Sequence, residues 1–454
     1  MRKSANVNIK NNRHKLRKGR MFFCRMMMSF LLLSGLLAAG QLTSVQAQIA
    51  APGVPAELEA LMLEALGFSP VLAVNQAQIE AQQAREQEVR SLPDPEINLG
   101  YFLNPAESST VPGRFTLSAM QMFPWFGYYT AAQQQQRELS GAEEQRYFET
   151  ALGLILEVQL AWLDLAENRY RQDLLQEEVA LLEELESWLA ARHESGLARQ
   201  SERIALRMER SRLRTQLQNL EEARHPMYVR LNSLLSRDPD SELTLTVEVP
   251  ERELPAAWEH ITRNLAENRP ELQLYVQQSR ALKQAAEQNR LMGMPEFGLG
   301  FEVMGRDYGT MNMMPSMNES FFLMASVRVP LWRGKYDGRR DAIEAGRRAT
   351  EYSREAALLR IRSEAEKQLN TWREARREMA LYDEELLTGF SQLYSLELES
   401  YAASDTGFRE LLQLRREWLD ARQSRLQAWF RAERELARIE RETGAWLPLV
   451  RDLR

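Results

Sequence analysis

The sequence is poor in the side chains that most often bind metals or form cross-links. Its 454 residues include one cysteine and four histidines. Cys24 precedes an apolar run, whereas a bacterial lipoprotein carries its cysteine directly after such a run. We therefore expect no disulfide, no thiolate ligand and no lipid anchor of that kind. His14 lies near the N-terminus, and His193, His225 and His260 are scattered without the spacing of metal ligands.

Enzymatic motifs are also missing. The sequence contains no GxxxxGKS/T phosphate-binding loop, no GxSxG and no HExxH. Paired acids such as Glu143-Glu144 and Glu384-Glu385 belong to helical segments, where plain solvated charge is the simplest interpretation. We therefore predict that the protein is not an enzyme, that it holds no cofactor, and that any energy it uses comes from a partner.

Long apolar runs are confined to the N-terminal segment, which is predicted to be a secretory signal peptide (residues 1–47). Residues 1–25 carry nine Lys or Arg and no acid, and the run from Met26 to Ala39 has 14 residues. Val45-Gln46-Ala47 then ends in a cleavage pattern. A mitochondrial presequence fits the compact apolar run less well.

The remaining chain is acidic. The 58 Lys and Arg less the nine in the leader leave 49, against 64 Asp and Glu, which argues against a nucleic-acid partner. No later stretch approaches the roughly 18 to 20 apolar residues of a membrane-spanning helix. An exported chain of this kind is either soluble or embedded in a membrane through β-strands.

Two segments about 200 residues apart repeat the same features. PEINLGYF at residues 95–102 aligns with PEFGLGFE at 295–302, and FPWFG at 123–127 aligns with VPLWRG at 329–334. Such a repeat predicts a duplicated structural unit. The predicted parts after the signal peptide are a first repeat (48–236), a linker with one short strand (237–255), a second repeat (256–442) and a C-terminal tail (443–454).

Each copy contains two segments in which apolar residues alternate with polar residues or glycine. In the first of them Ile97, Leu99 and Tyr101 alternate with Asn98 and Gly100, and the same period of two marks three further segments. This period is typical of strands with one apolar face. We therefore predict two β-hairpins, at about 95–123 and at about 295–330.

Long helices follow each predicted hairpin. Residues 128–192 contain no proline, and 65 helical residues at about 1.5 Å each span on the order of 100 Å. Residues 335–402 are similar, and such lengths indicate coiled-coil packing. Turns at about 193–197 and 404–408 each place a glycine where the chain reverses, and Pro226 predicts a kink in the returning helix.

Four strands are too few to close a transmembrane barrel alone. Open sheet edges are not tolerated in lipid, and the smallest common barrels have about eight strands. Three chains would supply twelve strands, whereas two would give a barrel filled by its own side chains. The predicted fold class is therefore mainly α with a small β part. In it, a duplicated helix, strand, strand and helical-hairpin unit supplies the strands of a trimeric 12-stranded β-barrel. The alternative is a secreted or periplasmic coiled-coil scaffold or adaptor that is not inserted in a membrane.

The duplicated layout, with NRPEL at residues 268–272, resembles the TolC-like outer-membrane efflux proteins over essentially the whole mature chain. The matching first-copy segment, NQAQ at residues 75–78, lacks the usual proline. The resemblance implies a homotrimer whose 12-stranded β-barrel lies in outer-membrane lipid and is continuous with an α-helical barrel in the periplasm. It further implies a passive exit duct of a tripartite efflux system, joined by a periplasmic adaptor (membrane fusion) protein to an inner-membrane pump. The FPWFG hinge favours a heavy-metal branch, with cargo such as Cu(I) or small toxic compounds.

A hinge of proline, aromatic residue and glycine joins strand to helix in both copies. Proline ends a strand because it cannot donate a ladder hydrogen bond, and glycine lets the chain swing into the helix. Aromatic residues are typical of the interface between a barrel and water. We therefore predict that the following residues lie at the periplasmic rim of the barrel: Phe123, Pro124, Trp125, Gly127, Pro330, Trp332 and Gly334.

The resemblance also implies roles for residues at and after the two turns. The turns would dock the adaptor, and the apolar side chains of Leu197 and Phe408 are expected to be exposed there. The docking residues are Gly196, Leu197, Thr406, Gly407 and Phe408. Beyond the second turn, the best-known members of the family narrow the tunnel with rings of carboxylates. This chain instead has Arg409, Gln413 and Arg416 at the implied periplasmic constriction. A ring of three arginines would repel cations, so a cation-selective gate is not expected.

Methionine is concentrated in the second predicted hairpin. Eight methionines lie between residues 292 and 324, and Met120 and Met122 lie in the first hairpin. Thioethers are soft ligands that select Cu(I), but methionine also fills irregular apolar gaps, so both interpretations stay open. No metal site is assigned, and the candidate ligands in the loop are Met311, Met313, Met314 and Met317.

Overall fold

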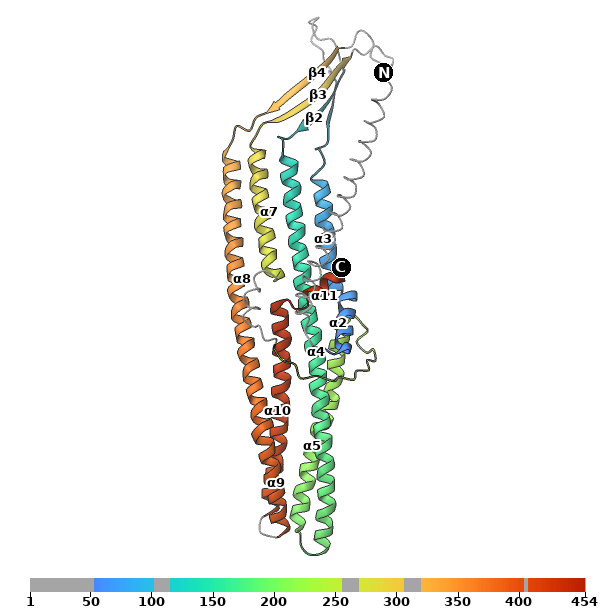
Figure 1. Ribbon diagram of the computed structural model, residues 1–454. Helices are drawn as coiled ribbons and strands as arrows, with labels where there is room; N and C mark the ends of the chain where they lie inside the picture. The colour runs from blue at the N-terminus through green and yellow to red at the C-terminus, as the bar shows by residue number, and fades with distance from the viewer. Residues whose placement is uncertain (1–52, 102–114, 255–268, 306–319, 404–406, 454) are drawn as a thin grey trace, which may run out of the picture. The chain divides into compact units, whose positions relative to one another are not determined.

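The computed structural model describes residues 53–101, 115–254, 269–305, 320–403 and 407–453. The chain divides into two compact units. The larger unit, Pro55–Gly444, contains the sheet and the long helices (Figure 1). The smaller unit includes α11 (Leu447–Asp452), which falls in the predicted C-terminal tail. The predicted signal peptide lies outside the described residues.

The strands β1 (Glu96–Tyr101), β2 (Phe115–Phe123), β3 (Glu296–Gly305) and β4 (Ser320–Arg328) form one sheet in that order. All neighbouring strands are antiparallel. β2 pairs with β3 along its whole length, from Phe115 opposite Gly305 to Phe123 opposite Phe297. The two predicted hairpins are therefore confirmed and join into a single sheet, which leaves β1 and β4 as its edges.

Long helices run from the sheet towards the opposite end of the larger unit. α4 (Tyr128–Glu194) has 67 residues and is on the order of 100 Å long at about 1.5 Å per residue. Its counterpart in the second copy begins as α8 (Gly334–Leu381) and continues as α9 (Leu387–Ala402). Between the two lies a π-helical turn, η1 (Tyr382–Leu386), that the sequence pattern did not predict.

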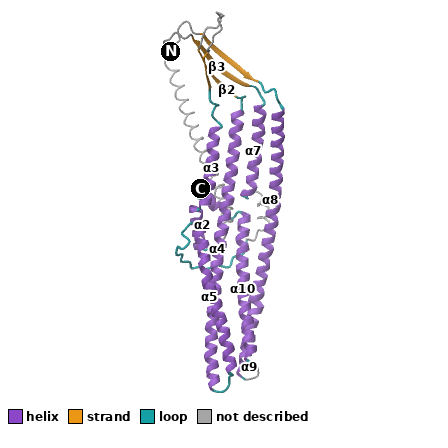
Figure 2. Ribbon diagram, turned by 180° about the vertical axis from the view of Figure 1, so that it is seen from behind, coloured by secondary structure: helices purple, strands orange, loops and turns teal. Residues whose placement is uncertain are grey.

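Within its described residues, the other helices of the larger unit are α2 (Ala56–Phe68), α3 (Pro70–Glu88), α5 (Gln200–Leu234), α7 (Pro270–Met292) and α10 (Phe408–Thr443). Near the sheet, α3, α4, α7 and α8 lie side by side in that order (Figure 1). Towards the turns, α4 packs against α5 and α10, and α10 packs against α9 (Figure 2). α5 runs through Pro226 without ending, although the proline removes one hydrogen-bond donor from its interior.

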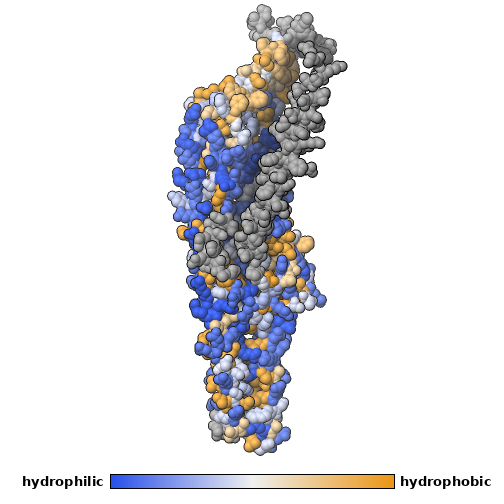
Figure 3. Space-filling model, viewed as in Figure 1, coloured by the Kyte–Doolittle hydropathy of each residue, from blue (hydrophilic) through white to orange (hydrophobic). Residues whose placement is uncertain are grey.

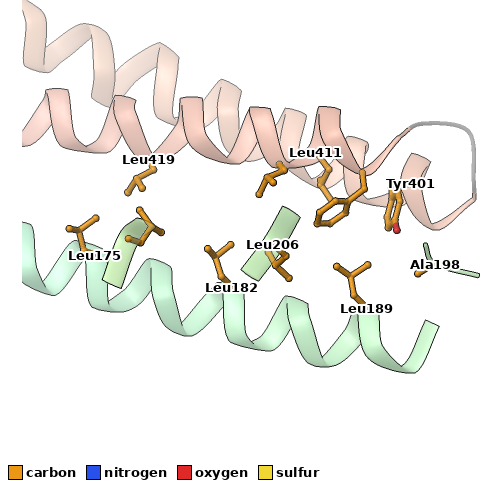
Figure 4. Packing of buried hydrophobic residues seen from close by; sticks show 11 residues of the cluster. Leu175, Leu182, Leu189, Ala198, Leu206, Tyr401, Leu411 and Leu419 are labelled. Atoms are coloured by element: carbon orange, nitrogen blue, oxygen red, sulfur yellow. The ribbon is translucent and has the colours of Figure 1, made fainter. Parts of the chain in front are cut away.

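A leucine heptad repeat forms the core near the turns. Leu175, Leu182 and Leu189 of α4 are buried at seven-residue spacing and face α10 (Figure 4). This spacing is the signature of a coiled coil, as the helix lengths predict. Each leucine that is fully buried contributes about 1.5–3 kcal/mol to stability. The other buried members of this leucine cluster are Ala198, Leu206, Leu213, Tyr401, Phe408, Leu411, Leu412 and Leu419.

The linker contains no strand within residues 237–254, contrary to the prediction. Instead it is tied to α2 through the Glu57 carboxylate. This group accepts hydrogen bonds from the backbone N–H groups of Thr246 (2.8 Å) and Val247 (3.2 Å), and from Trp162 Nε1 (3.2 Å). Burial alone would raise the pKa of Glu57, but these hydrogen bonds outweigh it and lower the pKa. The charged carboxylate thus satisfies backbone donors that a strand would otherwise pair.

Candidate functional site

The sheet has one mainly apolar face, and its other face carries glycine, methionine and polar residues together with Phe322. On the apolar face Ile97, Leu299 and Leu323 are exposed, Leu323 to 81%. Hydrophobic residues gather over the sheet in the space-filling view (Figure 3). Gly298 and Gly300 of β3 belong to the other face and are buried. Soluble monomers rarely expose a contiguous apolar patch, so this face is expected to be covered by lipid or by a partner.

The first hinge lies between the sheet and the helices. Pro124 follows Phe123, the last residue of β2, and Trp125 packs against Phe297 of β3 with ring centroids 5.7 Å apart. Gly127 immediately precedes α4 and has a φ of 86°, in the left-handed region. Glycine is favoured there because other residues place a Cβ against the following carbonyl oxygen. Trp125 therefore lies at the junction of strand and helix rather than in a helical core.

The second hinge has the same order of proline, tryptophan and glycine, but its tryptophan is more exposed. Pro330 follows β4, Trp332 is 84% exposed, and Gly334 begins α8. Gly334 has no left-handed φ, and nothing lies within 4 Å of the place where its Cβ would be. The backbone therefore requires the hinge glycine in the first copy but not in the second.

This difference leads to a prediction for the two hinge glycines. Gly127→Ala should lower the free energy of unfolding by about 1–2 kcal/mol, because alanine is strained in the left-handed region. The cause is not steric, since the added Cβ would meet Leu291 Cδ1 at an ordinary 3.6 Å. The matched control Gly334→Ala should leave stability unchanged or raise it slightly. Denaturant unfolding of the purified variants in detergent would measure both, and equal losses would contradict the assignment.

The two helix turns place their apolar residues differently. Leu197 is 62% exposed beside Gly196, which has a φ of 75°. Phe408 was expected to be exposed, and that prediction is wrong: the side chain is 3% exposed and packs into the leucine cluster. Gly407 immediately precedes α10, and Thr406 lies outside the described residues.

An aromatic and ionic cluster connects the two helix pairs close to their turns. Tyr401 Oη donates to Glu202 Oε2 at 2.8 Å, and the same carboxylate accepts from the backbone N–H of Arg199 at 2.9 Å. The Arg192 guanidinium lies 4.9 Å from the ring centre of Trp188 and 5.5 Å from that of Tyr401. Burial, assisted by Glu202, raises the pKa of Tyr401 to about 12, so its hydroxyl remains a donor. No sequence pattern predicts this cluster, because Tyr401 and Glu202 are 199 residues apart.

The residues of the implied constriction lie on one side of α10. Arg409 and Gln413 are exposed, and Gln413 Nε2 donates to Glu417 at 3.0 Å. Arg416 Nε donates to the buried carboxylate of Glu209, on α5, at 2.8 Å. Part of the arginine charge is therefore neutralised within the chain. Repulsion of cations by Arg409 and Arg416 stays a prediction. The ion pair with Glu209 reduces the positive charge that Arg416 contributes.

Arg269, the arginine of the NRPEL motif, is completely buried, with a side-chain exposure of 0%. Its Nη1 donates to the carbonyl oxygen of Arg441 at 2.6 Å, and its Nη2 lies 3.1 Å from Glu149 and 3.3 Å from Glu442. Arg441 in turn donates to Glu149 at 2.9 Å. This ion cluster fastens α4 and the end of α10 to the start of α7. The motif was visible in the sequence, but these partners were not.

The described ranges contain no group of three or more His, Cys, Asp or Glu placed to hold a metal ion. Across the same ranges, none of the helices combines the length and the apolar character needed to cross a membrane. The loop candidates Met311, Met313, Met314 and Met317 lie outside the described residues.

The arrangement of this sheet and these helices defines a fold seen in outer-membrane channels. No family model and no curated protein matches the chain. Among solved structures, the outer-membrane channel OprN is 18% identical with a TM-score of 0.70, covering 86% of this chain and 90% of that one. The outer membrane protein VceC of Vibrio cholerae is 16% identical (TM-score 0.71, 86% and 96%). CusC, described as forming a transmembrane channel, is 13% identical (TM-score 0.73, 87% and 93%). The chain therefore has the fold of these channels, which confirms the TolC-like fold expected from the sequence.

Proposed function

We propose that the protein is the outer-membrane exit duct of a tripartite efflux system, a passive channel rather than an enzyme. The observation that carries this proposal is the exposed apolar face of the sheet, in a fold shared with outer-membrane channels. The sheet would lie in outer-membrane lipid, because an apolar face of this kind is stable against hydrocarbon. The helices, on the order of 100 Å long, would reach through the periplasm.

The open edges of the sheet support a ring of copies, which we propose to be a homotrimer. β1 and β4 are the edges, and they run in opposite directions in an alternating sheet. Pairing β4 of one copy with β1 of the next would extend the antiparallel pattern and leave no open edge. Because the two edges differ, the contact is heterologous, and such a contact generates a closed ring when the rotation between neighbouring copies closes. Three copies would supply twelve strands, enough for an open lumen.

Exposed apolar side chains on the outer helices support the same ring near the sheet. Val71 and Val74 are exposed on α3, and Tyr352 and Leu359 are exposed on α8. α3 and α8 are the two outer helices of this half, and these residues lie 14 to 25 residues from the sheet ends of their helices. Apolar positions at matching heights on opposite edges suit a contact between neighbouring copies.

A second set of exposed apolar residues lies near the turns. Ile204 and Met208 are exposed on α5, and Leu393 and Leu396 are exposed on α9. All four lie four to nine residues from the turn ends of their helices. Contacts between α9 of one copy and α5 of the next would therefore cover both surfaces, in the same direction as the pairing of β4 with β1 proposed for the sheet.

The proposed partners follow from this placement. The exposed Leu197, at the turn formed with Gly196, would contact a periplasmic adaptor protein, and the turn at Gly407 would lie nearby. The adaptor would connect the duct to an inner-membrane pump that supplies the energy. Cargo such as Cu(I) or small toxic compounds would then pass through the lumen without chemical change.

Cell fractionation tests this function against the alternative of a soluble periplasmic scaffold. The duct should be recovered in the outer membrane and should run as a detergent-resistant trimer of the mature chain. A scaffold would instead be released with the periplasmic contents and stay soluble without detergent. Solubility without detergent would contradict the proposed function.

The proposed duct also makes a prediction for ion selectivity. Arg416→Ala removes one positive charge per copy and frees the carboxylate of Glu209 from one of its cations. The permeability of cations relative to anions should therefore rise in planar bilayers containing the reconstituted trimer. Arg347→Ala, which breaks an exposed ion pair on α8, provides the control and should change nothing. Strong cation selectivity that is unchanged by Arg416→Ala would rule out a constriction controlled by this arginine.

A further inference from the structure

Two methionines meet a glycine on the polar face of the sheet. Met120 and Met122 are on β2, two residues apart, so their side chains project from the same face. In the neighbouring strand β3, Met122 is opposite Gly298 and Met120 is opposite Gly300. On the far side of Gly298 stands Ser326 of β4. At Gly298 and Gly300, β3 therefore has no side chain on this face between the methionines and the serine.

The two thioether sulfurs converge over Gly298. Ser326 Oγ lies 3.5 Å from Met120 Sδ and 3.8 Å from Met122 Sδ. A Cβ built on Gly298 would lie 2.6 Å from Met122 Sδ and 3.5 Å from Met120 Sδ. Both sulfurs therefore border the same small space, which exists because residue 298 is glycine.

The chemistry of this space suits a soft cation. Thioethers are soft ligands that select Cu(I) over hard cations. The carboxylate in the adjacent row, Glu296, is engaged by Arg328 at 2.8 Å, so this ion pair adds no net charge that would attract hard divalent ions. Gap-filling accounts for methionine beside glycine. It does not require two sulfurs to border one space within reach of a hydroxyl group.

We propose that Met120 and Met122 form a binding site for a soft monovalent metal ion such as Cu(I), with Ser326 at its edge. A role of this site in transport rests on the proposed function, under which the site would lie on the wall of the duct, close to the helices. Two thioethers give a low coordination number, which suits a site that cargo enters and leaves. Met324 occupies the row of Met120, across Gly300, and offers a neighbouring thioether on the same wall.

The test measures Cu(I) binding to the detergent-solubilised full chain. The ion is kept reduced without oxygen and titrated in competition with a chelator of known affinity. In the background protein the four loop methionines are replaced by leucine, so that binding there does not contribute: Met311→Leu, Met313→Leu, Met314→Leu and Met317→Leu. We expect one Cu(I) per chain in this background, with sulfur ligands in X-ray absorption spectra.

Adding Met120→Leu and Met122→Leu should weaken binding at least tenfold and remove the sulfur signal. Leucine conserves side-chain volume, so the sheet should remain intact. The matched control is Met304→Leu, a methionine on the same face of β3 but two rows beyond Met120, and it should bind like the background. Gly298→Ala, which fills the space between the sulfurs, should also weaken binding while leaving both methionines in place.

The proposal is overturned if the background protein binds no Cu(I), or if the double variant binds as tightly as the background. Should the double variant fail to form the oligomer of the background protein, Gly298→Ala decides the matter alone. These results are independent of the proposed function, because binding is measured in detergent and needs no transport. A soluble protein that still binds Cu(I) through Met120 and Met122 would refute the duct but not the site.

Discussion

Replacing Arg269 with alanine is expected to lower the free energy of unfolding by about 3–5 kcal/mol. The substitution leaves Glu149 and Glu442 close together with Arg441 as their remaining ion-pair partner, and it removes a donor from the Arg441 carbonyl oxygen. A buried charge that loses its partner keeps the full penalty of desolvation. Equilibrium unfolding by denaturant in detergent would measure the loss.

The size of this loss should depend on pH. Burial raises the pKa of Glu442, whereas Arg269 and Arg441 act to lower it. Without Arg269 the pKa of Glu442 in the folded protein should rise further above its value in the unfolded chain. The folded state then binds the proton more tightly than the unfolded state, so its stability increases as the pH falls through this folded-state pKa. The deficit of Arg269→Ala should therefore shrink on acidification from neutral pH.

The control for this prediction is another arginine of the same region. Arg360 pairs with Glu271 at 2.6 Å, but its side chain is 58% exposed. Arg360→Ala should cost no more than about 1 kcal/mol, because water screens an exposed ion pair. Equal losses in the two variants, or a deficit of Arg269→Ala that does not change with pH, would show that the buried cluster is not the cause.

The features that the sequence predicted correctly have local causes. The alternation of Ile97, Leu99 and Tyr101 with polar residues follows from the pleat of a single strand. Pro124 ends β2 because proline has no N–H group to donate to the ladder. Gly127 adopts a left-handed φ, which glycine does without strain. The absence of proline over residues 128–192, from which coiled-coil packing was predicted, similarly reports on one helix. Strands, hinges and coiled-coil packing were therefore accessible before any contact was known.

The features that the sequence did not reveal depend on distant residues. Phe408 was assigned to an exposed turn, yet it is the first residue of α10 and lies three and four residues before the buried Leu411 and Leu412. It therefore belongs to the buried face of that helix. Arg416 looked like a free charge because its partner, Glu209, is 207 residues away. The convergence of Met120 and Met122 over Gly298 similarly required the pairing of β2 with β3, which no local pattern specifies.

A charge on the apolar face of the sheet should prevent stable insertion into the membrane. Leu323 is in the middle of β4 and is 81% exposed in the single chain, so its replacement loses little packing within the chain. An arginine on the lipid-facing side of a barrel costs about 2–4 kcal/mol near the bilayer midplane. A trimer contains three copies, so the costs add. We expect Leu323→Arg to abolish the detergent-resistant oligomer in outer-membrane fractions.

Ser118→Arg is the matched control, since it introduces the same charge at a similar height on the opposite face. Ser118 pairs with Glu302 across β2 and β3, so an arginine there gains an opposite charge as its cross-strand neighbour. In the proposed barrel the arginine side chain would point into the water-filled lumen, where its charge is tolerated. If Ser118→Arg inserts normally and Leu323→Arg does not form the detergent-resistant oligomer, the apolar face is the one covered by lipid. If both variants insert normally, the apolar face is not in contact with hydrocarbon, and the sheet does not form the wall of a membrane channel.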